Sequence, residues 1–152
     1  MGIREIFVSK KYKFWLGITN IFVLFIVGCQ NNLSTQCNRI VEIANETNQK
    51  LSQIKQTNQL SNQDLQSWLQ AASIFDEAAV ELKSLKIKDE QLIVYQNKLV
   101  ELWQIYARTT NEAIEAREIK NLATLTKANN DTKETDKIVQ QITKQINGYC
   151  NK

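Results

Sequence analysis

Pairs of carboxylates at helical spacing are the first residues in this sequence whose type and separation suit chemistry. They are Glu42/Glu46, Glu77/Glu81 and Glu112/Glu115. Four-helix bundles hold di-iron sites with glutamates of this kind, but those sites also require a Glu-x-x-His motif. The 152-residue chain contains no histidine. We therefore interpret the pairs as solvated helix faces, and expect no metal and no cofactor.

One serine and one lysine repeat the spacing of a nucleophile motif. Ser52 and Lys55 stand in the Ser-x-x-Lys arrangement of penicillin-binding enzymes. The companion Ser-Asp-Asn and Lys-Thr-Gly motifs are absent from the sequence, and so is a Gly-x-Ser-x-Gly elbow. The lack of histidine also removes Ser-His and Cys-His pairs. The sequence therefore predicts a protein that is not an enzyme.

The first 28 residues join a basic stretch to an apolar one. Four basic residues lie between positions 4 and 13, and the following run over 14–27 has only Thr19 and Asn20 as polar side chains. At 1.5 Å per residue this run spans roughly 21 Å, less than the ~30 Å hydrocarbon core of a bilayer. A cleavable export leader is therefore favoured over a membrane-spanning helix.

The apolar run ends in a short motif, Ile26-Val27-Gly28-Cys29. This motif resembles the lipobox of bacterial lipoproteins, and the resemblance covers only the first 30 or so residues. It implies that residues 1–28 are a signal peptide, that Cys29 becomes the first residue of the mature chain, and that its sulfur carries diacylglyceryl. The new amine is often acylated as well, for example with palmitate. The alternatives are an ordinary signal peptide cut elsewhere, or a cysteine at the end of a buried helix.

The lipobox resemblance also implies a location. Two or three acyl chains are enough for stable anchoring in a membrane, where a single chain is marginal. We expect the protein to be anchored by lipid on the extracytoplasmic side of a membrane, which is the periplasmic, lumenal or cell-surface side.

Two cysteines, Cys37 and Cys150, remain after Cys29 has been assigned to lipid. Disulfides persist in exported proteins, so we expect these two residues to form one bridge. That bridge would close nearly the whole mature chain into one loop, and a loop of ~100 residues is worth about 4.7 kcal/mol in the chain-entropy account. Two independent thiols are the alternative.

Helix boundaries in the mature chain must be read from polar clusters and capping signals, because 29–152 contains no proline and a single glycine, Gly148. Asp89 and Asp131 are the expected N-caps of the third and fourth helices, and Gly148 is the expected C-cap of the fourth. Apolar residues spaced by three and four predict helices over about 36–58, 62–86, 90–121 and 131–148. The third of these is the longest.

The predicted number of helices agrees with the predicted disulfide. In an up-and-down bundle of four helices, Cys37 and Cys150 lie at the same pole, whereas three helices would separate them by far more than the ~7 Å Cα limit. The expected fold is all-α: an antiparallel up-and-down four-helix bundle with a long third helix. The expected organisation is a leader over 1–28, a tether over 29–36 and the bundle over 37–150.

The charges of the mature chain balance overall, and its basic character is confined to a local cluster. The leader carries four of the 19 basic residues and one of the 16 acidic ones, so the mature chain has 15 of each. This balance gives no footprint for nucleic acid. Lys83, Lys86 and Lys88 form a local basic cluster at the pole nearest Cys29, where anionic headgroups or a partner could contact it.

Three aromatic side chains, Tyr95, Trp103 and Tyr106, define a candidate ligand groove, although aromatic residues at such positions usually form core. We expect a membrane-anchored extracytoplasmic lipoprotein that acts as a non-enzymatic interaction or assembly subunit with a protein partner. The alternative is a lipoprotein that binds a small apolar ligand in an inter-helix groove.

Overall fold

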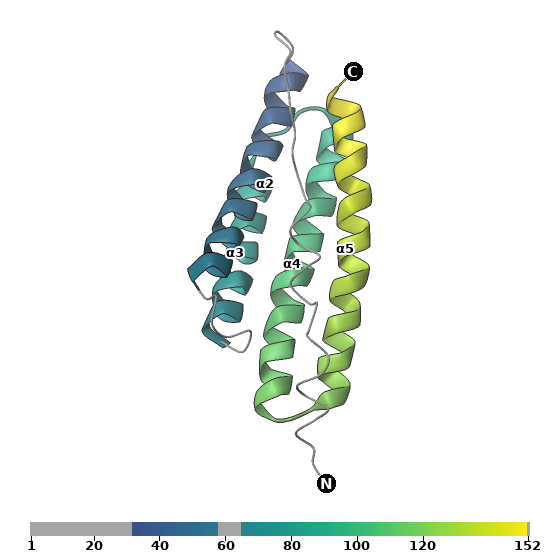
Figure 1. Ribbon diagram of the computed structural model, residues 1–152. Helices are drawn as coiled ribbons and strands as arrows, with labels where there is room; N and C mark the ends of the chain where they lie inside the picture. Colours follow the sequence, from purple (N-terminus) through teal and green to yellow (C-terminus); the bar gives the residue numbers. More distant parts are fainter. Residues whose placement is uncertain (1–31, 58–64, 152) are drawn as a thin grey trace.

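The described part of the chain, residues 32–57 and 65–151 of a computed structural model, forms an elongated bundle of four antiparallel helices (Figure 1). Among these residues there is no strand, so the predicted all-α four-helix bundle is confirmed. The leader and Cys29 lie outside the described residues. The helices are α2 (Asn32–Thr57), α3 (Leu65–Ser84), α4 (Glu90–Glu118) and α5 (Leu122–Cys150).

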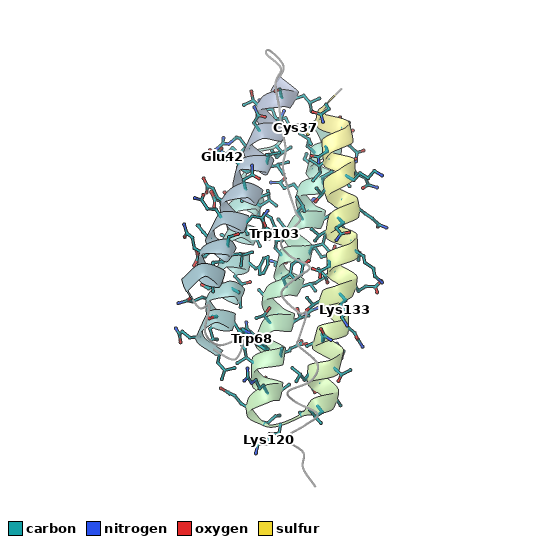
Figure 2. The ribbon with its side chains drawn as sticks, viewed as in Figure 1. Cys37, Glu42, Trp68, Trp103, Lys120 and Lys133 are labelled. Carbon is teal, nitrogen blue, oxygen red and sulfur yellow. A yellow bond between two sulfur atoms is a disulfide. The ribbon has the colours of Figure 1, made fainter. Side chains whose placement is uncertain are left out.

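Helix α4 is the central element, because it packs along both α3 and α5, while α2 packs mainly on α3. The core follows the apolar stripes expected from the sequence. Figure 2 shows Trp103 inside the bundle, whereas Glu42 and Lys133 point to its outside. All six residues of the first predicted stripe are buried, namely Cys37, Ile40, Ala44, Thr47, Leu51 and Ile54.

The boundary between α4 and α5 differs from the prediction. We expected the third helix to reach about residue 121 and the fourth to begin at Asp131, but α4 ends at Glu118 and α5 begins at Leu122. Lys120 adopts a left-handed conformation with φ 57°. Its N–H donates to the carbonyl of Arg117, and the N–H of Asn121 donates to the carbonyl of Ala116. These are the two hydrogen bonds of a Schellman motif, which ends a helix.

Asn121, and not Asp131, is the N-cap of α5, because its side chain accepts a hydrogen bond from the N–H of Thr124 at 3.1 Å. The polar cluster at 129–131 continues the helix instead of breaking it. Ala128, Thr132 and Thr135 face the core, and α5 therefore has the same 29-residue length as α4. The third helix is long, as predicted, but α5 equals it in length, so α4 is not the longest helix alone.

Two helix ends also differ from the prediction. α2 begins at Asn32, so part of the predicted tether over 29–36 is helical. Gly148 is not a C-cap: it has no positive φ, and α5 continues to Cys150 with Asn151 as the cap. The predicted N-cap of α4 is confirmed, since the side chain of Asp89 accepts a hydrogen bond from the N–H of Leu92 at 2.9 Å.

Candidate functional site

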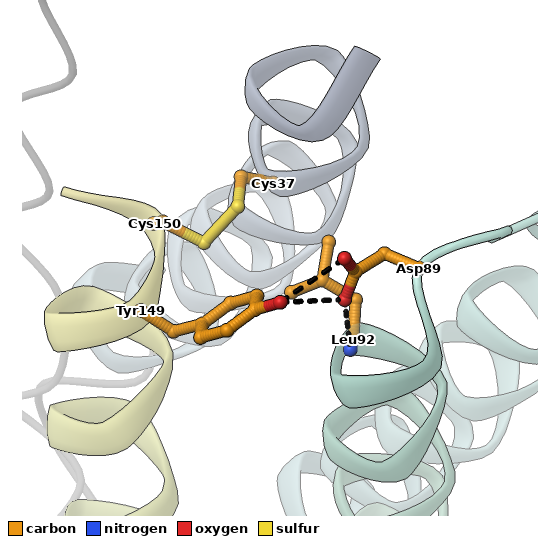
Figure 3. Close-up of a disulfide and its surroundings, with 5 residues drawn as sticks. All are labelled: Cys37, Asp89, Leu92, Tyr149 and Cys150. Atoms are coloured by element: carbon orange, nitrogen blue, oxygen red, sulfur yellow. Dashed lines mark hydrogen bonds between the residues drawn. A yellow bond between two sulfur atoms is a disulfide. The ribbon is translucent and has the colours of Figure 1, made fainter. Parts of the chain in front are cut away.

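A disulfide joins the beginning of α2 to the end of α5 (Figure 3). Cys37 is fully buried, and its Cα lies 5.9 Å from that of Cys150. We call this end of the bundle the disulfide pole. The even number of antiparallel helices is what brings these two residues together, as the sequence predicted.

A second contact at the disulfide pole links α5 to α4. The Tyr149 hydroxyl donates to the Asp89 carboxylate, whose two oxygens lie 3.1 and 3.0 Å from it. This hydrogen bond is the main cause that raises the pKa of Tyr149 above its ordinary value. Because Asp89 also caps α4, one carboxylate holds the start of α4 against the end of α5 (Figure 3).

Helix α2 is bonded to the same pole through Gln36, whose importance the sequence did not indicate. Its side-chain oxygen accepts hydrogen bonds from the backbone N–H groups of Lys88 and Asp89, at 2.5 and 3.1 Å. Gln96 of α4 donates to the carbonyls of Leu82 and Leu85 at the end of α3. These amides fix the α3–α4 connection against both neighbouring helices.

The predicted ligand groove is not formed by its three residues together. Trp103 and Tyr106 are buried in the core, with 6% and 3% of their surfaces exposed. Only Tyr95 borders a groove, an open one of about 680 Å³ between α4 and α5, where its ring lies edge-on to that of Tyr149, with centroids 6.0 Å apart. The other residues that line it are Gln91, Val94, Asn97, Lys98, Glu101, Ile142, Gln145 and Gly148.

Tyr106 has a structural partner instead of a ligand. Its hydroxyl donates to the Asp136 carboxylate of α5, and its ring stacks on Phe75 with centroids 4.8 Å apart. Burial, followed by the carboxylate, raises the pKa of Tyr106 far above its ordinary value. Burial also raises the pKa of Asp136, and the hydrogen bond from Tyr106 opposes this shift in part.

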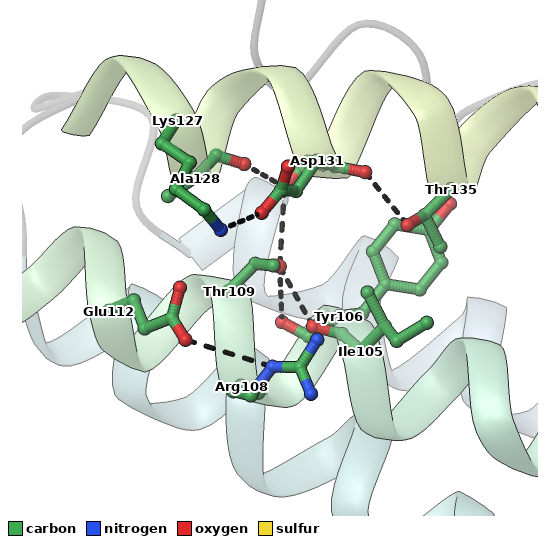
Figure 4. A network of polar contacts seen from close by, with 10 residues as sticks. Ile105, Tyr106, Arg108, Thr109, Glu112, Lys127, Ala128, Asp131 and Thr135 are labelled. Atoms are coloured by element: carbon green, nitrogen blue, oxygen red, sulfur yellow. Dashed lines mark hydrogen bonds and ion pairs between the residues drawn. The ribbon is translucent and has the colours of Figure 1, made fainter. Parts of the chain in front are cut away.

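Threonines continue the polar contact between α4 and α5 toward the other end of the bundle (Figure 4). The Thr109 hydroxyl lies 3.3 Å from that of Thr132 and 2.9 Å from the carbonyl of Ile105. The Thr135 hydroxyl donates to the carbonyl of Asp131. Each of these hydroxyls satisfies its hydrogen-bonding capacity within a helix, which permits burial.

The end opposite the disulfide pole is the turn between α4 and α5, which we call the distal turn. Two large apolar side chains are exposed there, Ile119 at 66% and Leu122 at 61%. Nearby, the Arg117 guanidinium lies 5.6 Å from the ring centroid of Trp68 on α3. The sequence did not indicate this exposed pair, because the third helix was expected to continue through Ile119 to about residue 121.

The residues first considered for catalysis have ordinary helix-surface contacts. The Ser52 hydroxyl donates to the carbonyl of Asn48 at 2.8 Å. Glu77 accepts a hydrogen bond from Ser73, and Glu112 pairs with Arg108 at 3.7 Å. Within 32–57 and 65–151, no three His, Cys, Asp or Glu side chains gather closely enough to hold a metal ion.

Within the same described ranges, no helix combines the length and the apolar character needed to cross a membrane. We take the disulfide pole as the candidate site, because Gln36, Asp89, Tyr149 and the two cysteines tie three helices together there. Comparison with known proteins found no match for this chain among protein families, curated proteins or solved structures.

Proposed function

We propose that the protein is an extracytoplasmic lipoprotein, anchored through Cys29, that acts as a non-enzymatic interaction or assembly subunit. The observation that carries this proposal is the Cys37–Cys150 disulfide, which closes the bundle a few residues after the lipobox cysteine. Disulfides persist in oxidising compartments outside the cytoplasm. The disulfide and the leader thus both favour export.

The geometry of the bundle supports a role in presenting a surface. Because α2 begins at Asn32, only three residue steps separate it from Cys29, a reach of about 11 Å. Helices of 29 residues extend for roughly 44 Å. An anchor at Cys29 therefore puts the disulfide pole against the membrane and the distal turn, with Ile119 and Leu122, about 40 Å away from it.

The anchor is tested by the Cys29→Ser variant of the full chain. We expect the wild-type protein to fractionate with membranes and to gain mass from acyl chains, and the variant to lose both properties. Ser52→Ala is the control, because Ser52 is an exposed residue of α2 and its change leaves both the lipobox and the disulfide intact. Membrane fractionation that is unchanged in Cys29→Ser would contradict the proposal.

The presenting role is tested at the distal turn. Crosslinking in the native membrane should capture a protein partner, and the double variant Ile119→Asn/Leu122→Asn should reduce this capture at least tenfold, the loss expected for a removed apolar anchor of ~1.4 kcal/mol. Val80→Asn is the control, because Val80 is 69% exposed but lies on α3. If the wild type, the double variant and Val80→Asn captured equal amounts of partner, the distal turn would not belong to the partner interface.

The groove between α4 and α5 favours a second candidate function, the binding of a small ligand. Its volume of about 680 Å³ lies within the range of volumes of ligand sites. Tyr95 and Tyr149 also supply the kind of aromatic surface that lines such sites. Native mass spectrometry of the protein purified from its own membrane tests this candidate. A retained small molecule that Tyr95→Ala releases would support it, and an unliganded mass would count against it.

A further inference from the structure

The connection between α3 and α4 is a short non-helical segment, residues 85–89, that crosses the disulfide pole. Its side chains alternate, as in extended backbone. Leu85 and Ile87 pack against the core, whereas Lys86 and Lys88 are exposed. Lys83, in the last turn of α3, is exposed as well. We call Lys83, Lys86 and Lys88 the basic edge.

The basic edge is fixed in place on the bundle. Gln36 of α2 accepts hydrogen bonds from the backbone N–H groups of Lys88 and Asp89, so the segment is bonded to the helix that follows the lipobox. Since the backbone is held at this point, the lysine side chains project from a defined position at the pole.

Three carboxylates, Glu81, Asp89 and Glu90, lie near the basic edge in sequence, and none of them forms an ion pair with its lysines. Asp89 is engaged by the N–H of Leu92 and the hydroxyl of Tyr149. Glu81 and Glu90 are exposed on the flanking helices, Glu81 on the same helix as Lys83. None of the three lysines forms an ion pair with another described residue, since the ion pairs found there are Lys98–Glu101, Arg108–Glu112 and Lys127–Asp131.

We propose that the basic edge docks the disulfide pole onto the anionic headgroups of the bilayer that holds the lipid anchor. This inference rests on the proposed attachment through Cys29. The mature chain has no net side-chain charge, so attraction to a membrane has to come from a local cluster. The short link from Cys29 to Asn32 reaches about 11 Å, comparable with the Debye length of ~8–10 Å at which surface charges still act.

Lysine labelling on vesicles tests this docking directly. The purified lipidated protein is reconstituted into vesicles of phosphatidylcholine alone, or of phosphatidylcholine mixed with phosphatidylglycerol, and its lysines are acetylated under limiting conditions. On the anionic vesicles we expect the basic edge to be labelled about fivefold more slowly per lysine than on the neutral ones, and the difference to disappear in high salt. Lys120, at the distal turn, and Lys133 should be labelled equally on both.

Paired charge-reversal variants complete the experiment. In Lys86→Glu/Lys88→Glu, the remaining Lys83 should lose its slow labelling on anionic vesicles. Lys133→Glu/Lys137→Glu is the matched control, because it changes the same charge on the outside of α5, and it should leave Lys83 protected. All four positions are exposed, so both variants should fold.

The outcomes separate this inference from the proposed anchor. Failure of the wild-type protein to float with either kind of vesicle would contradict the anchor itself. Flotation with equal labelling of the basic edge on both vesicles would contradict docking on anionic lipid and leave the anchor intact. The same labelling can be carried out in native membranes. Lysines that are labelled slowly there, but equally on both kinds of vesicle, would be covered by an acidic protein partner, and this result would overturn the lipid assignment.

Discussion

Lys120 is the residue at which the backbone departs most clearly from what its side chain prefers. Its φ of 57° lies in the left-handed region, which costs an ordinary L-residue about 1–2 kcal/mol. The conformation persists because the N–H groups of Lys120 and Asn121 donate the two hydrogen bonds of the Schellman motif at the end of α4. Helices that end in this left-handed conformation usually place glycine at this position, and this chain has none nearby.

We therefore expect Lys120→Gly to raise the free energy of unfolding by about 1 kcal/mol, because glycine adopts this conformation without a Cβ clash. Lys133→Gly, at an exposed position inside α5, should instead lower it by about 1 kcal/mol. Urea unfolding of the two variants checks both signs. A loss of stability in Lys120→Gly would mean that the turn does not constrain this residue.

Asp136 is a half-buried carboxyl whose pKa lies above its ordinary value of 3.8 in the folded protein, mainly because of burial. A folded state with the higher pKa binds the proton more tightly than the unfolded chain does. Its contribution to stability is therefore greatest below pH 3.8 and is lost as the pH rises through the folded pKa.

Asp136→Asn should remove this pH dependence, since the amide oxygen still accepts the hydrogen bond from Tyr106 and does not ionise. The stability of the wild type relative to the variant should decrease as the pH rises from below 3.8. Unfolding curves at a series of pH values measure this difference. A difference that stays constant, or that grows with pH, would contradict the shift.

Among the elements, the α3–α4 connection depends on a side chain from a third helix. Gln36 lies more than fifty residues away in sequence, yet it satisfies two backbone N–H groups of this connection. Segments outside regular structure must satisfy such groups elsewhere, and a buried donor without an acceptor costs about 1–3 kcal/mol.

Gln36→Leu keeps the approximate size of the side chain but removes the acceptor. We expect it to lower the free energy of unfolding by about 1–3 kcal/mol and to speed hydrogen exchange at the Lys88 and Asp89 amides. Gln36→Glu keeps an oxygen acceptor and should preserve slow exchange at both amides. Unchanged exchange in Gln36→Leu would show that water replaces the side chain.

At the scale of the whole molecule, the disulfide cross-links the first and last described helices directly, and these two helices make few other contacts with each other. It spans 113 residues of sequence. In the chain-entropy account, a loop of this size stabilises a fold by about 4.7 kcal/mol.

We therefore expect Cys37→Ser/Cys150→Ser to lower the free energy of unfolding by up to about 4.7 kcal/mol, with α2 separating from α5 first. Urea unfolding of the oxidised wild type and the double variant measures the loss. Reduced wild-type protein is the control and should behave like the variant. Equal stability of all three would mean that helix packing alone holds the pole together.

Features that depend on periodicity and on an even number of helices could be predicted from the sequence alone. Apolar spacing of three and four identified four helices and every buried residue of the first stripe, because that spacing is how a helix buries one face. The even helix number then required Cys37 and Cys150 to share a pole. Asp89 was identifiable as a cap because an acid in front of an apolar stripe is a local signal.

Features that depend on contacts between residues distant in sequence could not be predicted, because they arise only when the helices pack together. Burial of Ala128, Thr132 and Thr135 against α4 kept α5 helical through 129–131, where local polarity suggested a break. Packing sent Trp103 and Tyr106 into the core and left Tyr95 at a groove. The bond from Gln36 to the 85–89 segment has no sequence signal, because a side-chain amide finds its partner only after the helices have come together.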